Sequence, residues 1–362
     1  MSTRKVKPKR INLALQGGGA LGAYTWGVLD RILEDDRLEI AAISGASAGA
    51  MNGVVLCEAL VEGGKPEART ALRKFWEGIA QAGAASPYRR SPLQAMMLSS
   101  LGPAVGDAIA APWAWWLNAM TDASSPYTTN PLNLNPVGDV LDRLVDFDRV
   151  KRCRSVRLYV AATNVETGRA RIFTNTEMTS RHVLASACLP QMFRAVEIDG
   201  AHYWDGGYMG NPPLFPLFDK PASRDVLIVQ INPIVRPGVP KTAADIASRV
   251  NEITFNASLL REFHAIDFVA RLLDQGRLEE GRYNRMLIHV VSDDAALLPL
   301  GAMAKLNTDF GFFEELFAIG RLAAERWIHD HFADLGERST IDLGEMFKGE
   351  IGPSGSRHAS TD

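Results

Sequence analysis

The chain has 362 residues, of which 46% are hydrophobic, and a formal net charge of −3. This is enough apolar material for one large α/β core or for two smaller domains. So small a charge excludes the strongly basic field of a nucleic-acid-binding protein, and we expect no nucleic-acid partner. The three cysteines, Cys57, Cys153 and Cys188, are too few and too far apart for a disulfide framework or a metal site, and we expect them to be reduced and buried.

The two ends of the chain differ from the rest in composition. Residues 1–10 are basic and are not followed by the apolar segment of a secretory signal, so we expect a disordered tail. Residues 349–362 are rich in Gly and Ser and are also expected to be disordered. No stretch reaches the roughly 18 apolar residues of a membrane-spanning helix. We therefore expect a cytoplasmic protein, with an electrostatic contact between the basic tail and anionic lipid at the inner face of the membrane as a further hypothesis.

A glycine-rich segment, residues 17–22 (GGGALG), lies between an expected buried strand at residues 11–15 and an expected helix at residues 23–34. Successive glycines are unfavourable in chain entropy and are used where backbone amides must come close to a ligand or another group. Two interpretations compete. The spacing matches the Gly-x-Gly-x-x-Gly pattern of a dinucleotide site. Alternatively, the glycine amides form an oxyanion hole.

The second expected strand, residues 40–43, discriminates between these interpretations. A dinucleotide site needs an acidic residue at the end of this strand for the ribose hydroxyls, whereas the acidic residues here, at 35, 36 and 39, come before it. The strand leads instead into residues 45–49 (GASAG) and an expected helix at 50–60, which is the order of a nucleophile elbow. We therefore favour the oxyanion hole, with Ser47 as a candidate nucleophile. A Gly/Ser-rich turn without chemistry is the alternative for this motif.

The remaining pattern predicts further strands and helices in alternation. Strands are expected at 156–163, 170–174, 225–231 and 286–291, and helices at 67–78, 137–145, 180–187, 242–273 and 310–332. This alternation predicts a mostly parallel sheet with helices on both sides. Residues 86–136 are rich in Pro and Trp, and form either a lid or lipid-facing surface or an excursion that packs on the body of the protein.

A third motif follows an expected hairpin around Asp199 and Gly200. Asp205 comes at the end of the second hairpin strand and is followed directly by Gly206 and Gly207. Taken alone, an aspartate before two glycines is a common turn. Its meaning depends on the two other motifs.

With the segments GGGALG (17–22), GASAG (45–49) and DGG (205–207) in this order, the chain resembles the patatin-like phospholipase family. The resemblance covers about residues 11–218 and includes the segments at 162–164 (ATN) and 186–190 (SACLP). It implies a three-layer α/β/α sandwich with a mostly parallel central sheet. It also implies a catalytic domain at residues 11–219 and a mainly helical C-terminal extension at 220–348 packed on it, like that of a bacterial subgroup.

The resemblance also implies the chemistry, which is hydrolysis of acyl esters, commonly of phospholipids or neutral lipids, without a metal or other cofactor. Ser47 matches the nucleophile and Asp205 the base of a Ser–Asp dyad. In one respect the chain departs from the family, whose glycine loop often has Arg or Lys where this chain has Leu21. The implied oxyanion hole comprises Gly17, Gly18 and Gly19 with the amide of Ala48, and the remaining motif positions are Gly45, Gly49, Gly206 and Gly207.

Three alternatives to the dyad enzyme remain. His202 lies three residues before Asp205 and is the best-placed histidine for a Ser-His-Asp triad, but strand alternation places it on the opposite face from Asp205. A dinucleotide-dependent enzyme would use the loop at 17–22. A catalytically silent scaffold would keep the fold only to bind a partner. The sequence predicts no oligomeric state.

Overall fold

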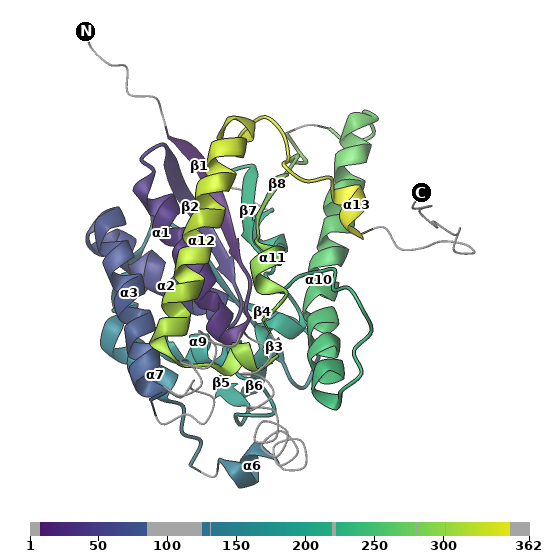
Figure 1. The fold of residues 1–362 in the computed structure, drawn as a ribbon. Coiled ribbons are helices and arrows are strands. Elements are labelled where there is room, and N and C mark those ends of the chain that lie inside the picture. Colours follow the sequence, from purple (N-terminus) through teal and green to yellow (C-terminus); the bar gives the residue numbers. More distant parts are fainter. Residues whose placement is uncertain are drawn as a thin grey trace, which may run out of the picture.

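The computed structural model describes residues 8–84, 125–130, 132–218, 222–279, 281–300 and 302–347. Within these residues the chain forms an eight-stranded sheet in the order β5-β6-β3-β2-β1-β7-β8, with β4 paired to β3 (Figure 1). The strands are β1 (Lys9–Leu15), β2 (Leu38–Gly45), β3 (Arg157–Asn164), β4 (Ala170–Thr174), β5 (Val196–Ile198), β6 (Ala201–Asp205), β7 (Asp225–Val229) and β8 (Leu287–Val291).

Five neighbouring strands, β3, β2, β1, β7 and β8, pair in parallel. The hairpin of β5 and β6, and also β4, join β3 in antiparallel pairs. The expectation of a mostly parallel sheet is confirmed. The antiparallel addition of β6 brings its last residue, Asp205, opposite Ala162 of β3.

Helices cover both faces of this sheet. The longer ones are α1 (Gly22–Glu34), α2 (Ala48–Glu62), α3 (Gly64–Ala82), α7 (Pro136–Leu144), α8 (Phe147–Arg152), α9 (Ser180–Ser186), α10 (Ala243–Asp274) and α12 (Phe310–His331). Three short helices, α6 (Pro126–Thr129), α11 (Asp294–Leu297) and α13 (Leu343–Phe347), complete the set. In Figure 1, α12 crosses in front of the sheet, and α10 stands to the right of the sheet, beside α13.

The alternation of side chains along the strands explains the three layers. In β1, Leu13 and Leu15 point into one hydrophobic cluster with α1, α2, α3 and α12, whereas Ala14 points into a second cluster with α10. Successive residues of β7 divide in the same way, because side chains alternate between the two faces of a strand. The expected three-layer α/β/α sandwich is therefore confirmed.

The region beyond residue 219 is mainly helical, as expected, but it also contributes two strands to the sheet. β7 pairs with β1 and β8 pairs with β7, so the sheet continues across the expected boundary between catalytic domain and extension. α12 packs closely on α1, where a Cβ atom on Gly27 would meet the carbonyl oxygen of Phe317. The division into a domain at 11–219 and an extension at 220–348 remains a prediction.

The expected N-terminal tail ends earlier than residue 10, because β1 begins at Lys9. Lys9 pairs with Leu38, and its Nζ donates to the carbonyl oxygen of Leu335 at 2.7 Å, which fixes this residue on the fold. Three parts lie outside the described residues: the rest of the N-terminal tail (1–7), most of the Pro/Trp-rich segment (86–124 and 131) and the C-terminal tail (349–362). None of the described helices combines the length and apolar character needed to cross a membrane.

Candidate active site

Ser47 occupies a tight turn between β2, which ends at Gly45, and α2, which begins at Ala48. Its backbone has φ 54° and ψ −126°, a conformation that residues with a side chain rarely adopt. A Cβ atom on Gly45 would lie 2.7 Å from the carbonyl carbon of Gly49, so glycine is needed where the strand and the helix meet. The strand, turn and helix expected at this motif are present, and Ser47 is partly exposed between buried neighbours.

Asp205 is the last residue of β6 and is only 1% exposed. Burial raises the pKa of its carboxyl group to about 6, while the Gly207 amide and the Ser47 hydroxyl act to lower it. The Gly207 amide donates to Oδ1 at 2.7 Å. Among the described residues, Oδ2 has no hydrogen-bond partner. Asp205 and Ser47 are therefore near enough to interact, although no hydrogen bond joins their side chains.

The segment after α9 binds the backbone of both residues. The Ser47 amide donates to the carbonyl oxygen of Ser186 at 3.1 Å and lies 3.0 Å from its Oγ. The Asp205 amide donates to the carbonyl oxygen of Cys188 at 2.8 Å. Residues 186–188 thus hold the turn after β2 and the end of β6 at one place. They lie in the SACLP segment, where no local pattern in the sequence indicates this role.

The glycine-rich loop lies against Ser47, because a Cβ atom on Gly17 would be 2.6 Å from the Cβ of Ser47. The Gly17 amide donates to Oδ1 of the buried Asn211 at 2.6 Å, so it is not free to bind an oxyanion. Within the described part of the chain, no acceptor is bonded to the amides of Gly18, Gly19 or Ala48. Of the four expected donors, Gly18, Gly19 and Ala48 therefore remain candidates.

His202 faces away from this site. It is exposed, and its Nδ1 lies 2.6 Å from Oε1 of Glu166, whereas Asp205 on the same strand is buried. The expected alternation along β6 is confirmed. Among the described residues, His289 is a buried histidine; its Nε2 lies 3.0 Å from Oδ1 of Asp225, at the opposite end of β7 from the glycine loop.

Two pockets among the described residues lie near this region, and neither is lined by Ser47 or Asp205. The larger, of about 930 Å³, is bordered by Cys188, Phe193 and Arg194 and so adjoins the segment that holds Asp205.

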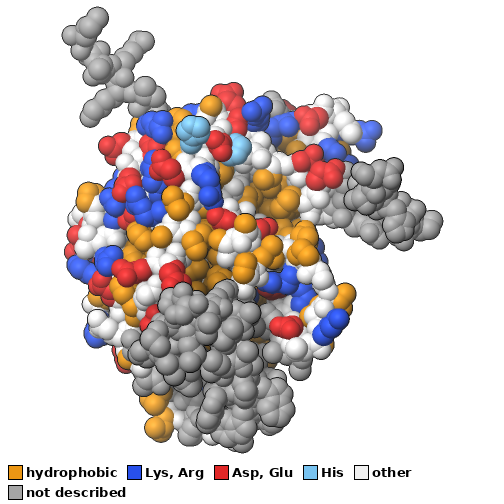
Figure 2. All heavy atoms as spheres, viewed as in Figure 1, with side chains coloured by type: hydrophobic (Ala, Val, Ile, Leu, Met, Phe, Trp, Pro, Cys, Tyr) orange, Lys and Arg blue, Asp and Glu red, His pale blue; other side chains and the backbone are white. Residues whose placement is uncertain are grey.

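The described residues contain no group of three or more His, Cys, Asp or Glu side chains that could hold a metal ion. On the face shown in Figure 2, basic and acidic side chains are interspersed around apolar ones and form no uniformly basic surface. All three cysteines are buried, as expected.

The comparison with protein families decides the assignment. The model of the family described as patatin-like phospholipase matches residues 13–218, which is more than half of the chain. This chain belongs to the patatin-like phospholipase family. At the level of the family, the patatin-like chain is thereby grouped with lipid acyl hydrolases.

Solved structures give weaker similarities to the patatin-like chain. VipD from Legionella pneumophila has 14% sequence identity and a TM-score of 0.36, with 89% of this chain and 72% of that chain covered. ExoU, in its heterodimeric complex with SpcU from the type III secretion system of Pseudomonas aeruginosa, has 17% identity and a TM-score of 0.33. That similarity covers 91% of this chain and 62% of ExoU. No curated protein matches significantly. Values this low indicate nothing about the site.

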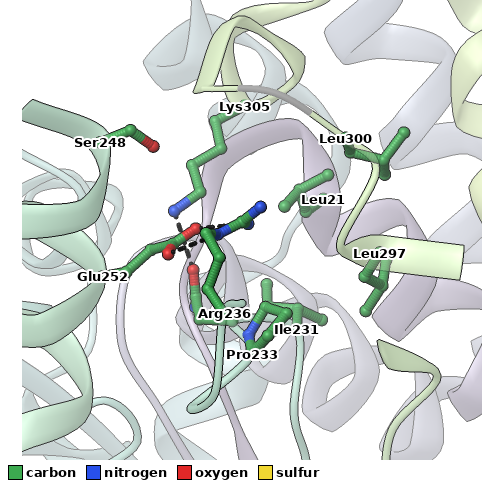
Figure 3. A pocket seen from close by; sticks show the side chains of 10 residues that line it. Leu21, Ile231, Pro233, Arg236, Ser248, Glu252, Leu297, Leu300 and Lys305 are labelled. Atoms are coloured by element: carbon green, nitrogen blue, oxygen red, sulfur yellow. Dashed lines mark hydrogen bonds and ion pairs between the residues drawn. The ribbon is translucent and has the colours of Figure 1, made fainter. Parts of the chain in front are cut away.

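The patatin-like chain has Leu21 at the loop position where the resemblance leads us to expect a basic residue. Leu21 is 5% exposed and lines the smaller pocket together with Arg236 and Lys305 (Figure 3). Two cationic side chains from beyond residue 218 therefore lie beside this position. No sequence motif indicates this arrangement.

Proposed function

We propose that the chain is a serine acyl hydrolase that cleaves acyl esters of lipids through a Ser47–Asp205 dyad and an acyl-enzyme intermediate. The observation that carries the proposal is the buried Asp205 carboxyl group, whose Oδ2 lacks a partner among the described residues, close to the partly exposed Ser47. An unpaired buried acceptor is unfavourable by about 1–3 kcal/mol. A hydroxyl proton arriving from Ser47 would satisfy it.

In this mechanism Asp205 accepts the proton of Ser47 Oγ as the oxygen attacks the ester carbonyl. With a pKa of about 6, the carboxylate is a stronger base than an ordinary aspartate and is still ionised at neutral pH. The hydrogen bond from the Gly207 amide holds Oδ1 and leaves Oδ2 to receive the proton.

The negative charge on the tetrahedral intermediate would be bound by the amides of Gly18, Gly19 and Ala48. Ala48 begins α2, so the positive end of the helix dipole adds to this stabilisation. Asp205 then gives the proton taken from Ser47 to the leaving alcohol oxygen as the C–O bond breaks. Water, deprotonated by the regenerated Asp205 carboxylate, attacks the acyl-enzyme; the proton returns to Ser47 Oγ as the acid is released. Lipid as the substrate class follows from the family, and contact with a membrane surface is part of this proposal.

Ester hydrolysis by purified variants tests the proposal. Wild type should hydrolyse members of a panel of short-chain esters and phospholipid vesicles, whereas Ser47→Ala and Asp205→Asn should each lose activity by several orders of magnitude. His202→Ala is the matched control and should keep most activity, because this exposed side chain pairs with Glu166. No turnover of any ester by wild type would support the silent scaffold. Tight NAD binding together with an absence of ester turnover would support the dinucleotide alternative.

A further inference from the structure

The peptide group between Gly17 and Gly18 is held from its carbonyl side. The Gly17 oxygen accepts hydrogen bonds from Nδ2 of Asn232 at 2.8 Å and from Nδ2 of Asn211 at 3.3 Å. In a trans peptide the C=O and N–H groups point in opposite directions. Fixing the Gly17 oxygen therefore fixes the direction of the Gly18 amide, which is one of the proposed oxyanion donors.

Asn232 follows β7 and is 1% exposed. Its backbone amide and that of Ile231 both donate to Oε1 of Gln16 at 2.9 Å, so it is tied to the residue that precedes the glycine loop. Its carbonyl oxygen and that of Pro233 face Nδ2 of Asn256 on α10. The Asn232 backbone is thus fixed on both sides, and its side chain is delivered to the loop in one position.

Lys305 determines which way the Asn232 amide points. Its Nζ donates to Asn232 Oδ1 at 2.9 Å. An ammonium group has only donors, so Oδ1 must face it and Nδ2 is left to donate to Gly17. The positive charge also polarises the chain of hydrogen bonds that ends on the Gly17 peptide.

The charge on Lys305 is set by its surroundings. Figure 3 shows its side chain directed toward Arg236 and Glu252. Burial lowers the pKa of Lys305 and the nearby Arg236 lowers it further, whereas Glu252 acts to raise it. Glu252 is itself paired with Arg236 at 2.8 Å and with Arg249 at 3.2 Å. Lys305 therefore lies at the edge of this ion-pair cluster, and its Nζ donates to Oδ1 of Asn232.

The backbone of Lys305 touches the loop at a second point. Lys305 lies in the short helix η5 (Ala302–Leu306), and its carbonyl oxygen occupies the place that a Cβ atom on Gly19 would take. Gly19 has φ 59°, which also favours glycine. One residue from late in the chain therefore contacts Gly19 directly and reaches Gly17 through Asn232.

We propose that Asn232 and Lys305 are positioning residues that aim the Gly18 amide at the oxyanion. Both lie outside residues 13–218, so the C-terminal part of the chain completes the active site in addition to covering the sheet. This inference rests on the proposed acyl hydrolase function.

Two substitutions and a matched control test the inference. Asn232→Asp keeps an acceptor for Lys305 but replaces the donor to the Gly17 oxygen with a second acceptor, which repels it. Lys305→Met removes the cation at a partly buried position, so it remains informative should Asn232→Asp fail to fold. The control is Asn12→Asp, which makes the same change in β1, where the buried Asn12 donates to the carbonyl oxygen of Ser223.

The expected result is a fall in kcat of at least about tenfold for both variants with KM changed by less than about twofold, since removal of a donor outright lowers kcat by about 10²–10³-fold. A thionoester gives a second readout, because its sulfur accepts hydrogen bonds poorly. The ratio of ester to thionoester turnover should fall in both variants and stay at the wild-type value in Asn12→Asp. A merely structural role would lower both rates together.

The outcomes separate this inference from the proposed function. Absence of Ser47-dependent turnover in wild type overturns the proposed function and this inference with it. Another result overturns this inference alone. In it, wild type shows Ser47-dependent turnover, and both Lys305→Met and a folded Asn232→Asp keep the wild-type kcat and the wild-type ester-to-thionoester ratio. Circular dichroism and thermal unfolding of each variant establish that the folded protein is being measured.

Discussion

Gly17 and Asn211 exchange two hydrogen bonds in the buried interior. The Gly17 amide donates to Asn211 Oδ1 at 2.6 Å, and Asn211 Nδ2 returns a bond to the Gly17 oxygen at 3.3 Å. Asn211 lies six residues after Asp205, just beyond the short helix η3 (Gly206–Tyr208). The side chain thus ties the glycine loop to the segment that carries the proposed base.

Replacing Asn211 with Leu should destabilise the protein and lower its activity. The change leaves the Gly17 amide buried without an acceptor, so we expect a loss of about 1–3 kcal/mol in the free energy of unfolding. We also expect kcat to fall, because the loop beside Ser47 is released. Urea unfolding and ester turnover measure the two effects. A variant with wild-type stability and wild-type kcat would contradict the role assigned to this pair.

The pH dependence of activity should follow Asp205. The proposed base must be ionised, and burial raises the pKa of Asp205 to about 6. We expect kcat/KM to rise with pH through a single ionisation near pH 6 and to level off above pH 7. A profile that is already flat at pH 5, as an ordinary aspartate with a pKa of about 3.9 would give, would contradict a base with a raised pKa at this position.

The same pKa predicts how Asp205 affects stability. Because the pKa in the folded protein, about 6, exceeds the reference value of 3.8, the folded state holds the proton more tightly than the unfolded state. Stability is therefore lost as pH rises from about 4 through about 6, by on the order of 3 kcal/mol in total.

Asp205→Asn should remove this loss, since the amide does not ionise. At pH 8 we expect the variant to be more stable than wild type by up to about 3 kcal/mol, and at pH 4 we expect the difference to fall below about 1 kcal/mol. Thermal or urea unfolding at both pH values measures it. A difference of the same size at pH 4 and at pH 8 would show that the burial of a charged carboxylate is not its cause.

The backbone strain at Ser47 predicts a difference between two inactive variants. Ser47→Ala and Ser47→Gly both lack the hydroxyl group, but only glycine adopts φ 54° and ψ −126° without strain. Strained conformations of this kind are unfavourable by about 1–3 kcal/mol. We therefore expect Ser47→Gly to unfold at a higher urea concentration than Ser47→Ala. If the alanine variant is the more stable, the turn is not strained in solution.

Local patterns in the sequence predicted the mostly parallel sheet with helices on both sides and made Ser47 a candidate nucleophile, whereas the role proposed for Asp205 came from the resemblance to the family. Strands and helices showed clear apolar periodicity. Ser47 lies in a Gly-x-Ser-x-Gly turn just after a strand, and Asp205 ends a strand before two glycines, where short motifs have a geometric meaning. The expected facing of His202 also followed from simple alternation along β6. The start of β1 at Lys9 was not predicted, because a long-range contact with the end of α12 fixes that residue.

The residues that hold the glycine loop could not be predicted in this way. Asn211 and Asn232 act on Gly17 from positions about 200 residues away, and an asparagine side chain has no spacing rule that reveals its partner. Lys305 gives no signal, because its role arises from the burial of one amine beside one amide oxygen. Only Asn211 had a usable clue, since it follows the Asp205 motif within a segment rich in Gly and Pro.

Covalent labelling with a fluorophosphonate, followed by mass spectrometry of the digested protein, tests the central claim most directly. The reagent phosphonylates an activated serine. We predict one adduct per wild-type chain, located on Ser47, with loss of esterase activity in proportion to labelling, and far slower labelling in Asp205→Asn. Two results would contradict the assignment of Ser47 and Asp205 as the dyad. One is labelling at another residue, and the other is a Ser47→Ala variant that is labelled and hydrolyses esters as fast as wild type.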